Sequence, residues 1–173
     1  MLIILTLPTS LTTLKNDYLP KRPPARISIE ELEALDFLNR QPAGVVLSVP
    51  FNPDWRLKFS EPKPLYAYET TAYISALSDK ETYLEDEMNL EITGYNWQMR
   101  REQTNKFFLT ADQNWGKEFL QSNNIKYIYL VKGQKMNLGL GDINGKKIFE
   151  NGETVIYRIK WDKIKVYEDY SSN

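Results

Sequence analysis

The sequence predicts an α/β domain: a small three-layer sandwich of Rossmann-like topology, with a mainly parallel sheet and a C-terminal antiparallel hairpin. Three observations predict this class. From residue 27 onward, segments with apolar residues at helical spacing alternate with short apolar runs of strand length. The run "IKYIYLVKG" (125–133) has few polar residues, as expected for a strand buried on both faces at the centre of a sheet. Near the C-terminus, Asn151-Gly152 separates two strand-like runs, a strong pattern for a hairpin.

The first half of this domain is predicted to contain two helices, each followed by a strand. Ser28 and Glu31 have the spacing of a capping box, with Ser28 as the N-cap of the first helix. That helix ends near "NRQPAG" (39–44), and "VVLSVPF" (45–51) is a short buried strand. The next predicted elements are a proline-rich loop, a helix and the strand "TYLED", at 52–64, 66–77 and 82–86.

The second half is predicted to contain two more helices, the central strand and the hairpin. The segment "GYNWQMRREQTNKFF" is the third helix, and Thr110 and Gln113 form a second capping box that opens the fourth. The fourth helix ends at Asn123-Asn124, because Asn tolerates the left-handed conformation that terminates a helix. Apolar and charged residues alternate along "VIYRIKW" (155–161), which predicts a last strand with one exposed face.

The ends of the chain differ from this domain in composition. The N-terminal stretch "MLIILTLPTSLTTL" is apolar but shorter than the roughly 20 residues of a membrane span. We expect it to be either the last turns of a membrane helix whose earlier part is missing, or an apolar lead-in that packs on the domain. The expected division is an apolar lead-in, a stiff proline-rich basic linker, one α/β domain and a polar tail, at 1–14, 15–26, 27–161 and 162–173.

Composition limits the classes of function. The chain has 173 residues, enough for one domain, and a net charge of −1 that gives no field to attract nucleic acid, so no nucleic-acid partner is expected. It contains no Cys and no His. These absences exclude thiolate nucleophiles, Cys- or His-ligated zinc and catalytic triads that use an imidazole. Any catalysis would have to use carboxylates, Lys, Tyr or Arg, and no cofactor is expected.

Three consecutive acids, Glu85, Asp86 and Glu87, lie at the end of the predicted strand "TYLED". Ligands of open α/β sheets bind at the carboxyl ends of the strands. Adjacent carboxylates at that edge could hold a divalent metal ion and a sugar-nucleotide diphosphate. The alternative is a solvated acidic loop, which the sequence favours because no phosphate-binding glycine loop accompanies the acids.

Four further residues are candidates for ligand binding: Trp55, Arg56, Trp97 and Arg100. The indole rings could stack on a sugar, and an Arg could clamp a phosphate or a carboxylate. The alternative for the aromatic residues is that they fill the core. For the arginines it is pairing with neighbouring acids on the surface.

Several phrases of the sequence together resemble a known class of protein domain. They are "ISIEELEALDFLN" before a buried strand, "ETTAYISALSDKETYLED", "RREQTNKFF" with "TAD", "FLQSNNIKYIYLVKG" and "KIFENGETVIYRI". In this order and spacing, over residues 27–159, the chain resembles the C-terminal extracytoplasmic domain of multi-pass bacterial and archaeal membrane proteins, the glycosyltransferases of the GT-C type and their relatives.

This resemblance implies a non-catalytic accessory domain on the extracytoplasmic face of the cell membrane. Its partners would be the membrane portion of its own parent protein and a glycan or lipid-linked sugar acceptor, which it would help to position. In such proteins the catalytic acid belongs to the membrane portion, so no catalytic residue is carried over to this chain. Two alternatives remain open: an independent carbohydrate- or partner-binding module, and a metal-dependent sugar transferase that uses Glu85, Asp86 and Glu87.

Overall fold

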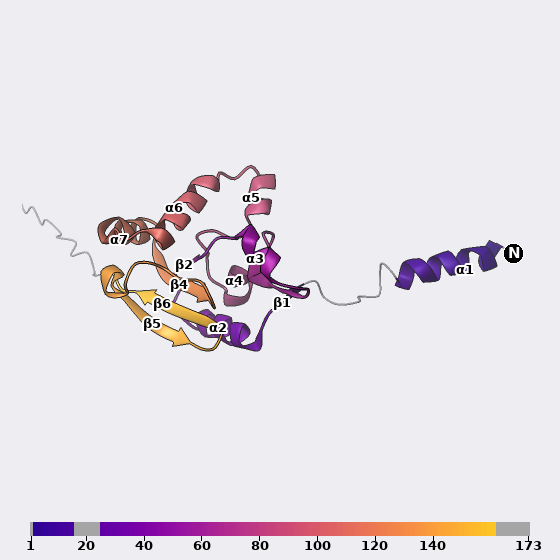
Figure 1. Ribbon diagram of the computed structural model, residues 1–173, viewed down its shortest axis with the longest axis horizontal. Coiled ribbons are helices and arrows are strands. Elements are labelled where there is room, and N and C mark those ends of the chain that lie inside the picture. The colour runs from indigo at the N-terminus through magenta and orange to yellow at the C-terminus, as the bar shows by residue number, and fades with distance from the viewer. Residues whose placement is uncertain (1, 16–24, 162–173) are drawn as a thin grey trace, which may run out of the picture.

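The computed structural model describes residues 2–15 and 25–161, which form the helix α1 (Leu2–Thr13) and an α/β domain (Figure 1). Helix α1 falls within the predicted apolar lead-in. Within the described ranges, no helix is both long and apolar enough to cross a membrane. Most of the predicted linker and the whole predicted tail lie outside the described residues.

The centre of the domain is a four-stranded mixed sheet in the order β2-β4-β6-β5. Strands β2 and β4 are parallel, while β4 and β5 each pair with β6 in the antiparallel sense. A parallel bridge between Val46 and Thr82 extends the sheet beyond β2. The α/β class with its C-terminal antiparallel hairpin is therefore confirmed. The strands are β2 (Val45–Ser48), β4 (Ile125–Val131), β5 (Gly145–Glu150) and β6 (Thr154–Ile159).

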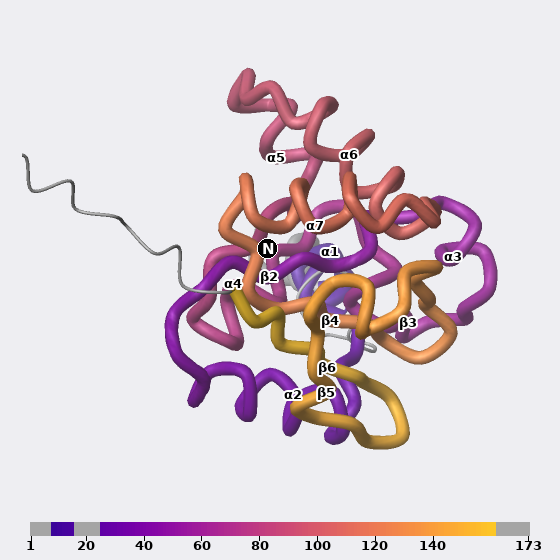
Figure 2. The backbone as a smooth tube through the Cα atoms, turned by 90° about the vertical axis from the view of Figure 1, so that its left-hand side faces the viewer, coloured from indigo at the N-terminus to yellow at the C-terminus, as the bar shows by residue number. Residues whose placement is uncertain are grey.

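Helices cover both faces of this sheet, and side chains of β4 point alternately into the two layers. Tyr127 and Tyr129 pack in the same cluster as side chains of α2 and α4, while Ile128 and Leu130 pack with side chains of α6 and α7. Figure 2 shows α2 below the sheet and the pair α6 and α7 above it. The prediction of a central strand buried on both faces is confirmed. These helices are α2 (Ile29–Asn39), α4 (Tyr73–Ser78), α6 (Gln98–Leu109) and α7 (Gln113–Ser122).

Several local predictions are confirmed by the backbone. The Ser28 hydroxyl accepts a hydrogen bond from the Glu31 N–H at 3.1 Å and caps α2. Asn124 has a φ of 52°, the left-handed conformation expected after α7. In the hairpin turn, Asn151 Oδ1 accepts a hydrogen bond from the Thr154 N–H at 2.9 Å, which holds the connection between β5 and β6.

Other local predictions are wrong. The predicted helix at 66–77 is divided into a 3₁₀ turn, η2 (Leu65–Ala67), and the short helix α4. The predicted strand at 82–86 is reduced to the bridge at Thr82. The cap of α7 is Asp112, whose carboxylate accepts hydrogen bonds from two N–H groups of the first turn, and not Thr110.

The loop predicted at 52–64 also contains regular structure. It holds α3 (Pro53–Lys58), and its end, β3 (Lys63–Pro64), pairs with β1 (Ala25–Arg26) in a small parallel sheet. A further helix, α5 (Glu87–Ile92), was not predicted. The prediction that one face of the last strand is exposed is also wrong in part. Ile156 lies on the same face as Arg158, yet it is fully buried in the cluster that includes side chains of α2.

Candidate functional site

A narrow cleft opens where β2 and β4 end, at the edge of the sheet where ligands of α/β proteins bind. Its volume is about 50 Å³, room for a few water molecules. Tyrosines and carboxylates dominate its polar lining, which includes Tyr66, Tyr68, Glu69, Tyr73, Glu85 and Asp86. The cleft therefore offers hydrogen-bond acceptors and aromatic edges to a ligand.

Glu85 is the first of the three candidate acids, and its carboxylate caps a helix. Its two oxygens accept hydrogen bonds from the N–H groups of Ile74 at 2.9 Å and Ser75 at 3.0 Å, in the first turn of α4. Burial raises the pKa of the Glu85 carboxyl, and the two N–H donors partly oppose that rise. A side chain ten residues away in the sequence therefore supplies the cap that α4 lacks locally.

Asp86 has one engaged oxygen and one free oxygen. Its backbone is left-handed, with a φ of 53°, and this turn directs the chain into α5. Oδ2 accepts a hydrogen bond from the Asn89 side-chain amide at 2.6 Å. Oδ1 is buried and has no hydrogen-bond partner among the residues that the structure describes. This oxygen is the unsatisfied acceptor of the cleft lining.

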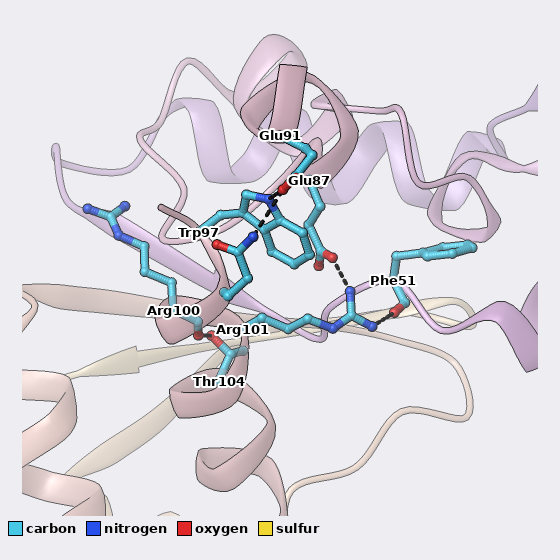
Figure 3. Close-up of polar contacts among 8 residues, drawn as sticks. Phe51, Glu87, Glu91, Trp97, Arg100, Arg101 and Thr104 are labelled. Atoms are coloured by element: carbon cyan, nitrogen blue, oxygen red, sulfur yellow. Dashed lines mark hydrogen bonds and ion pairs between the residues drawn. The ribbon is translucent and has the colours of Figure 1, made fainter. Parts of the chain in front are cut away.

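Glu87 forms a buried ion pair with Arg101, which joins α5 to α6 (Figure 3). The Glu87 side chain is only 3% exposed, and the same guanidinium donates a second hydrogen bond to the carbonyl of Phe51 at 2.8 Å. Burial raises the pKa of the Glu87 carboxyl, and the positive charge of Arg101 opposes that rise. The pair thus fixes α5 and α6 to the chain segment that leaves β2.

The three acids therefore turn to three different partners and do not converge on one point. In the described ranges, no group of three or more acidic, His or Cys side chains could hold a metal ion. The sequence suggested such a cluster because three acids are adjacent in the chain. Their side chains diverge because the chain makes a left-handed turn at Asp86. This turn separates Glu85, which follows the bridge at Thr82, from Glu87, the first residue of α5.

Of the predicted ligand-binding residues, Trp55 packs against an aromatic residue of the cleft lining. Its ring lies 5.7 Å from Tyr66, which lines the cleft, and 6.5 Å from Phe59, measured between ring centroids. The three rings form an aromatic cluster on and after α3, and Trp55 is half-buried within it. Arg56, on the same helix, is exposed.

Trp97 and Arg100 belong to a different group of side chains, on α6 and the segment before it. The Trp97 indole N–H donates to the Glu91 carboxylate at 2.7 Å (Figure 3). Arg100 donates to the carbonyl of Tyr83 at 3.0 Å, and its guanidinium lies 5.1 Å from the Tyr83 ring centroid. Neither Trp97 nor Arg100 lines the cleft, so the structure does not bring the four predicted residues together.

A buried polar cluster behind the cleft was missed by sequence reasoning. Glu31 is 3% exposed, and its carboxylate accepts a hydrogen bond from the Tyr129 hydroxyl at 3.4 Å. The buried Tyr73 side chain lies beside the same carboxyl group. Burial raises the pKa of the Glu31 carboxyl, and the tyrosine hydroxyls partly oppose that rise. The capping-box spacing explained Glu31 locally, and no sequence pattern connects it to Tyr129, 98 residues away.

Comparison with known proteins gives weak structural likeness alone. No family model matches the chain, and a search of curated proteins finds no match. Among solved structures, the C-terminal globular domain of an oligosaccharyltransferase from Archaeoglobus fulgidus is similar with a TM-score of 0.47 and 13% sequence identity. The similarity covers 78% of this chain and 99% of that domain. At these values the likeness assigns the chain to no family.

Proposed function

We propose that this chain is a non-catalytic accessory domain of a glycosyltransferase-like membrane protein, on the extracytoplasmic face of the cell membrane. In this proposal the cleft at the ends of β2 and β4 holds hydroxyl groups of a glycan or of a sugar acceptor. The membrane portion of the parent protein supplies the catalytic residues.

The observation that carries the proposal is the chemistry of the cleft. Its half-buried carboxylates, Glu69 and Asp86, are hydrogen-bond acceptors by their chemistry, and one oxygen of Asp86 has no partner among the described residues. Sugar hydroxyls are donors that match such acceptors, and aromatic rings such as that of Tyr66 pack on the apolar faces of sugars. A neutral polyhydroxylated ligand fits this lining better than an anion, because no Lys or Arg of the described part of the chain lines the cleft.

The size of the cleft supports a role in positioning. Its volume of about 50 Å³ lies far below the roughly 300–1,000 Å³ of typical small-molecule sites. A hydroxyl or hydroxymethyl group can enter it, while the remainder of a glycan would lie on the rim beside Tyr66 and Trp55. A whole sugar nucleotide would need a larger cavity.

The absence of catalytic residue types supports a non-catalytic role. The sequence offers no imidazole and no thiol. Glu85 caps α4 and Glu87 is paired with Arg101, so each of these acids has a partner within the fold. Titration with Mg²⁺ or Mn²⁺ by calorimetry tests this point, because tight binding of either ion would favour the alternative of a metal-dependent transferase.

Glycan binding is tested by tryptophan fluorescence, with a glycan array first used to choose the oligosaccharide. Quenching should disappear in Trp55→Phe and persist in Trp97→Phe, because the Trp55 ring packs against Tyr66 on the cleft rim, whereas Trp97 does not line the cleft and its indole is held by Glu91. Affinity should fall at least about tenfold in Asp86→Asn, the loss expected for a hydrogen bond to a charged acceptor. The matched control is Glu102→Gln, an exposed acid on α6. Absence of binding to every glycan on the array would contradict the proposal.

Attachment to a membrane protein is tested separately, by fractionating source cells and blotting with an antibody against this domain. The proposal predicts a band far above the 20.3 kDa of this chain, in the membrane pellet. A soluble band near 20 kDa would contradict the membrane attachment and favour an independent binding module.

A further inference from the structure

Within the α/β domain at 25–161, the most exposed large apolar side chain is that of Leu57, on α3, which is 85% exposed. Its neighbours in the sequence are Arg56 and Lys58, and both are exposed as well. The Leu57 side chain therefore buries little of its apolar surface within the domain, and its two neighbours in the sequence are positively charged. This combination of one projecting apolar side chain with flanking cations is typical of a contact with an anionic lipid surface.

Two other basic residues lie at the same end of the domain. Helix α3 contacts η2, which directly follows β3, and β3 pairs with β1. Figure 1 shows α3 and β1 together at one end of the domain, and Figure 2 shows α3 beside β3. Arg26 of β1 is exposed, and Lys63 of β3 is half-buried. Because β1 is the first described element after the apolar helix α1, the chain also enters the domain at this end.

The charge of the chain is unevenly distributed in the sequence, with a basic excess in the described segments that form this end. Residues 25–26 and 53–64 together carry four Lys or Arg and two Asp or Glu, a net charge of +2. The whole chain has a net charge of −1, so the remainder carries −3. Such a distribution would orient the domain on a negatively charged surface with the α3 end toward it.

The three next most exposed large apolar residues are not flanked by basic residues on both sides. Ile92 is 75% exposed but follows Glu91, and Ile29 is 73% exposed but precedes Glu30 and Glu31. An anionic surface repels these acidic neighbours. Leu109 is 73% exposed, with the uncharged neighbours Phe108 and Thr110. Leu57 alone in this set of four has a cation on each side.

We propose that the α3 end of the domain rests on an anionic lipid bilayer. Leu57 inserts between the headgroups, while Arg56, Lys58 and Arg26 contact lipid phosphates. The contact lies outside the cleft and goes beyond the proposed function. A test of this bilayer contact does not depend on glycan binding, because the tryptophan fluorescence experiment described above measures glycan binding separately.

The absence of cysteine from the sequence permits a local test on the full chain. We would prepare Leu57→Cys, Ile92→Cys and Leu109→Cys, each labelled with the polarity-sensitive fluorophore NBD. Each protein would be mixed with vesicles of phosphatidylglycerol and phosphatidylcholine in equal parts, or of phosphatidylcholine alone. All three keep α1, so any binding through that helix is common to them.

The proposal predicts a blue shift and stronger emission at position 57 with the anionic vesicles, and no change at positions 92 and 109. The shift should weaken in 0.5 M NaCl, because surface charge attraction is screened at about that ionic strength. No shift at position 57, or an equal shift at all three positions, would overturn the proposal.

Charge variants provide the second measurement. Each basic residue near an anionic bilayer contributes roughly fivefold in partitioning, so Arg56→Glu with Lys58→Glu should raise the lipid needed for the half-maximal shift at position 57 at least roughly 25-fold. The matched control, Lys146→Glu with Lys160→Glu, changes two exposed lysines outside these segments and should leave the shift unchanged. Far-ultraviolet circular dichroism checks that both double variants are folded. An unchanged shift in the Arg56 and Lys58 variant would also overturn the proposal.

Discussion

The ion pair between Glu87 and Arg101 fixes α5 to α6 at the side of the cleft, and Arg101 extends the link to the carbonyl of Phe51. The Glu87 side chain is 3% exposed and that of Arg101 is 28% exposed, so the pair is largely removed from water. Breaking such a pair leaves a buried charge without compensation, whereas replacing both partners by apolar residues of similar volume is often harmless.

Arg101→Met should therefore destabilise the domain by about 3 kcal/mol, measured by urea unfolding. The double variant Glu87→Met, Arg101→Met should recover most of this loss, because it removes the uncompensated carboxylate as well. A single variant as stable as the wild type, or a double variant less stable than the single, would contradict the role given to this pair.

The cap that Glu85 supplies to α4 leads to a second prediction. Glu85→Ala leaves the N–H groups of Ile74 and Ser75 without their acceptor, which should cost about 1–2 kcal/mol in unfolding free energy. Hydrogen exchange at these two amides should accelerate in step with that loss. Glu81→Ala, the replacement of an exposed acid near the same turn, is the control and should change neither quantity.

The buried carboxyl of Glu31 predicts how stability varies with pH. Burial raises its pKa in the folded state above the ordinary value of 4.5, so the folded protein binds the proton more tightly than the unfolded chain. Stability from this group is present below pH 4.5 and is lost as the pH rises through the raised folded pKa. Glu85 and Glu87 act in the same direction, because burial raises their pKa values as well.

Glu31→Gln should remove the share of this pH dependence that Glu31 contributes. Urea unfolding measured from pH 4 to pH 7 should show a smaller decline of stability with rising pH in the variant than in the wild type. The control is Glu33→Gln, which alters an exposed acid of the same helix and should keep the wild-type slope. Parallel curves for wild type and Glu31→Gln would show that the buried carboxyl is not responsible.

Much of the fold could be predicted from local patterns. The apolar run of β4 predicts its position inside the sheet. Ser28 caps the start of α2, and the left-handed Asn124 follows the end of α7. In each of these cases the determining chemistry lies within a few residues of the feature that it specifies. The elements that sequence reasoning missed depend on contacts between distant residues.

The segment around α4 illustrates this dependence. Its apolar spacing predicted a continuous helix from residue 66, but α4 begins at Tyr73, where Glu85 supplies the cap from beyond the helix. The same contact draws Glu85 away from the sheet and helps to explain why the predicted strand is reduced to a bridge. Propensity within a window of sequence carries no information about such a partner.

The candidate site could be predicted in position but not in its contacts. The acids at 85–87 do lie at the carboxyl edge of the sheet, and all three line the cleft. Their partners, such as Arg101, come from other elements and could not be inferred from spacing. Trp55 and Trp97, equivalent as candidates in the sequence, lie in separate clusters: the Trp55 ring packs against Tyr66 of the cleft lining, whereas the Trp97 indole is bound to Glu91.

The central claim, that the cleft binds a glycan, is tested most directly by titrating the ¹⁵N-labelled full chain with the oligosaccharide chosen from the array and following its amide resonances. We predict saturable shifts confined to Trp55 on the rim and to the segments that line the cleft, at 48–51, 66–74, 84–87 and 129–134. Shifts confined to α6 around Trp97, or no shifts at millimolar oligosaccharide, would contradict the claim.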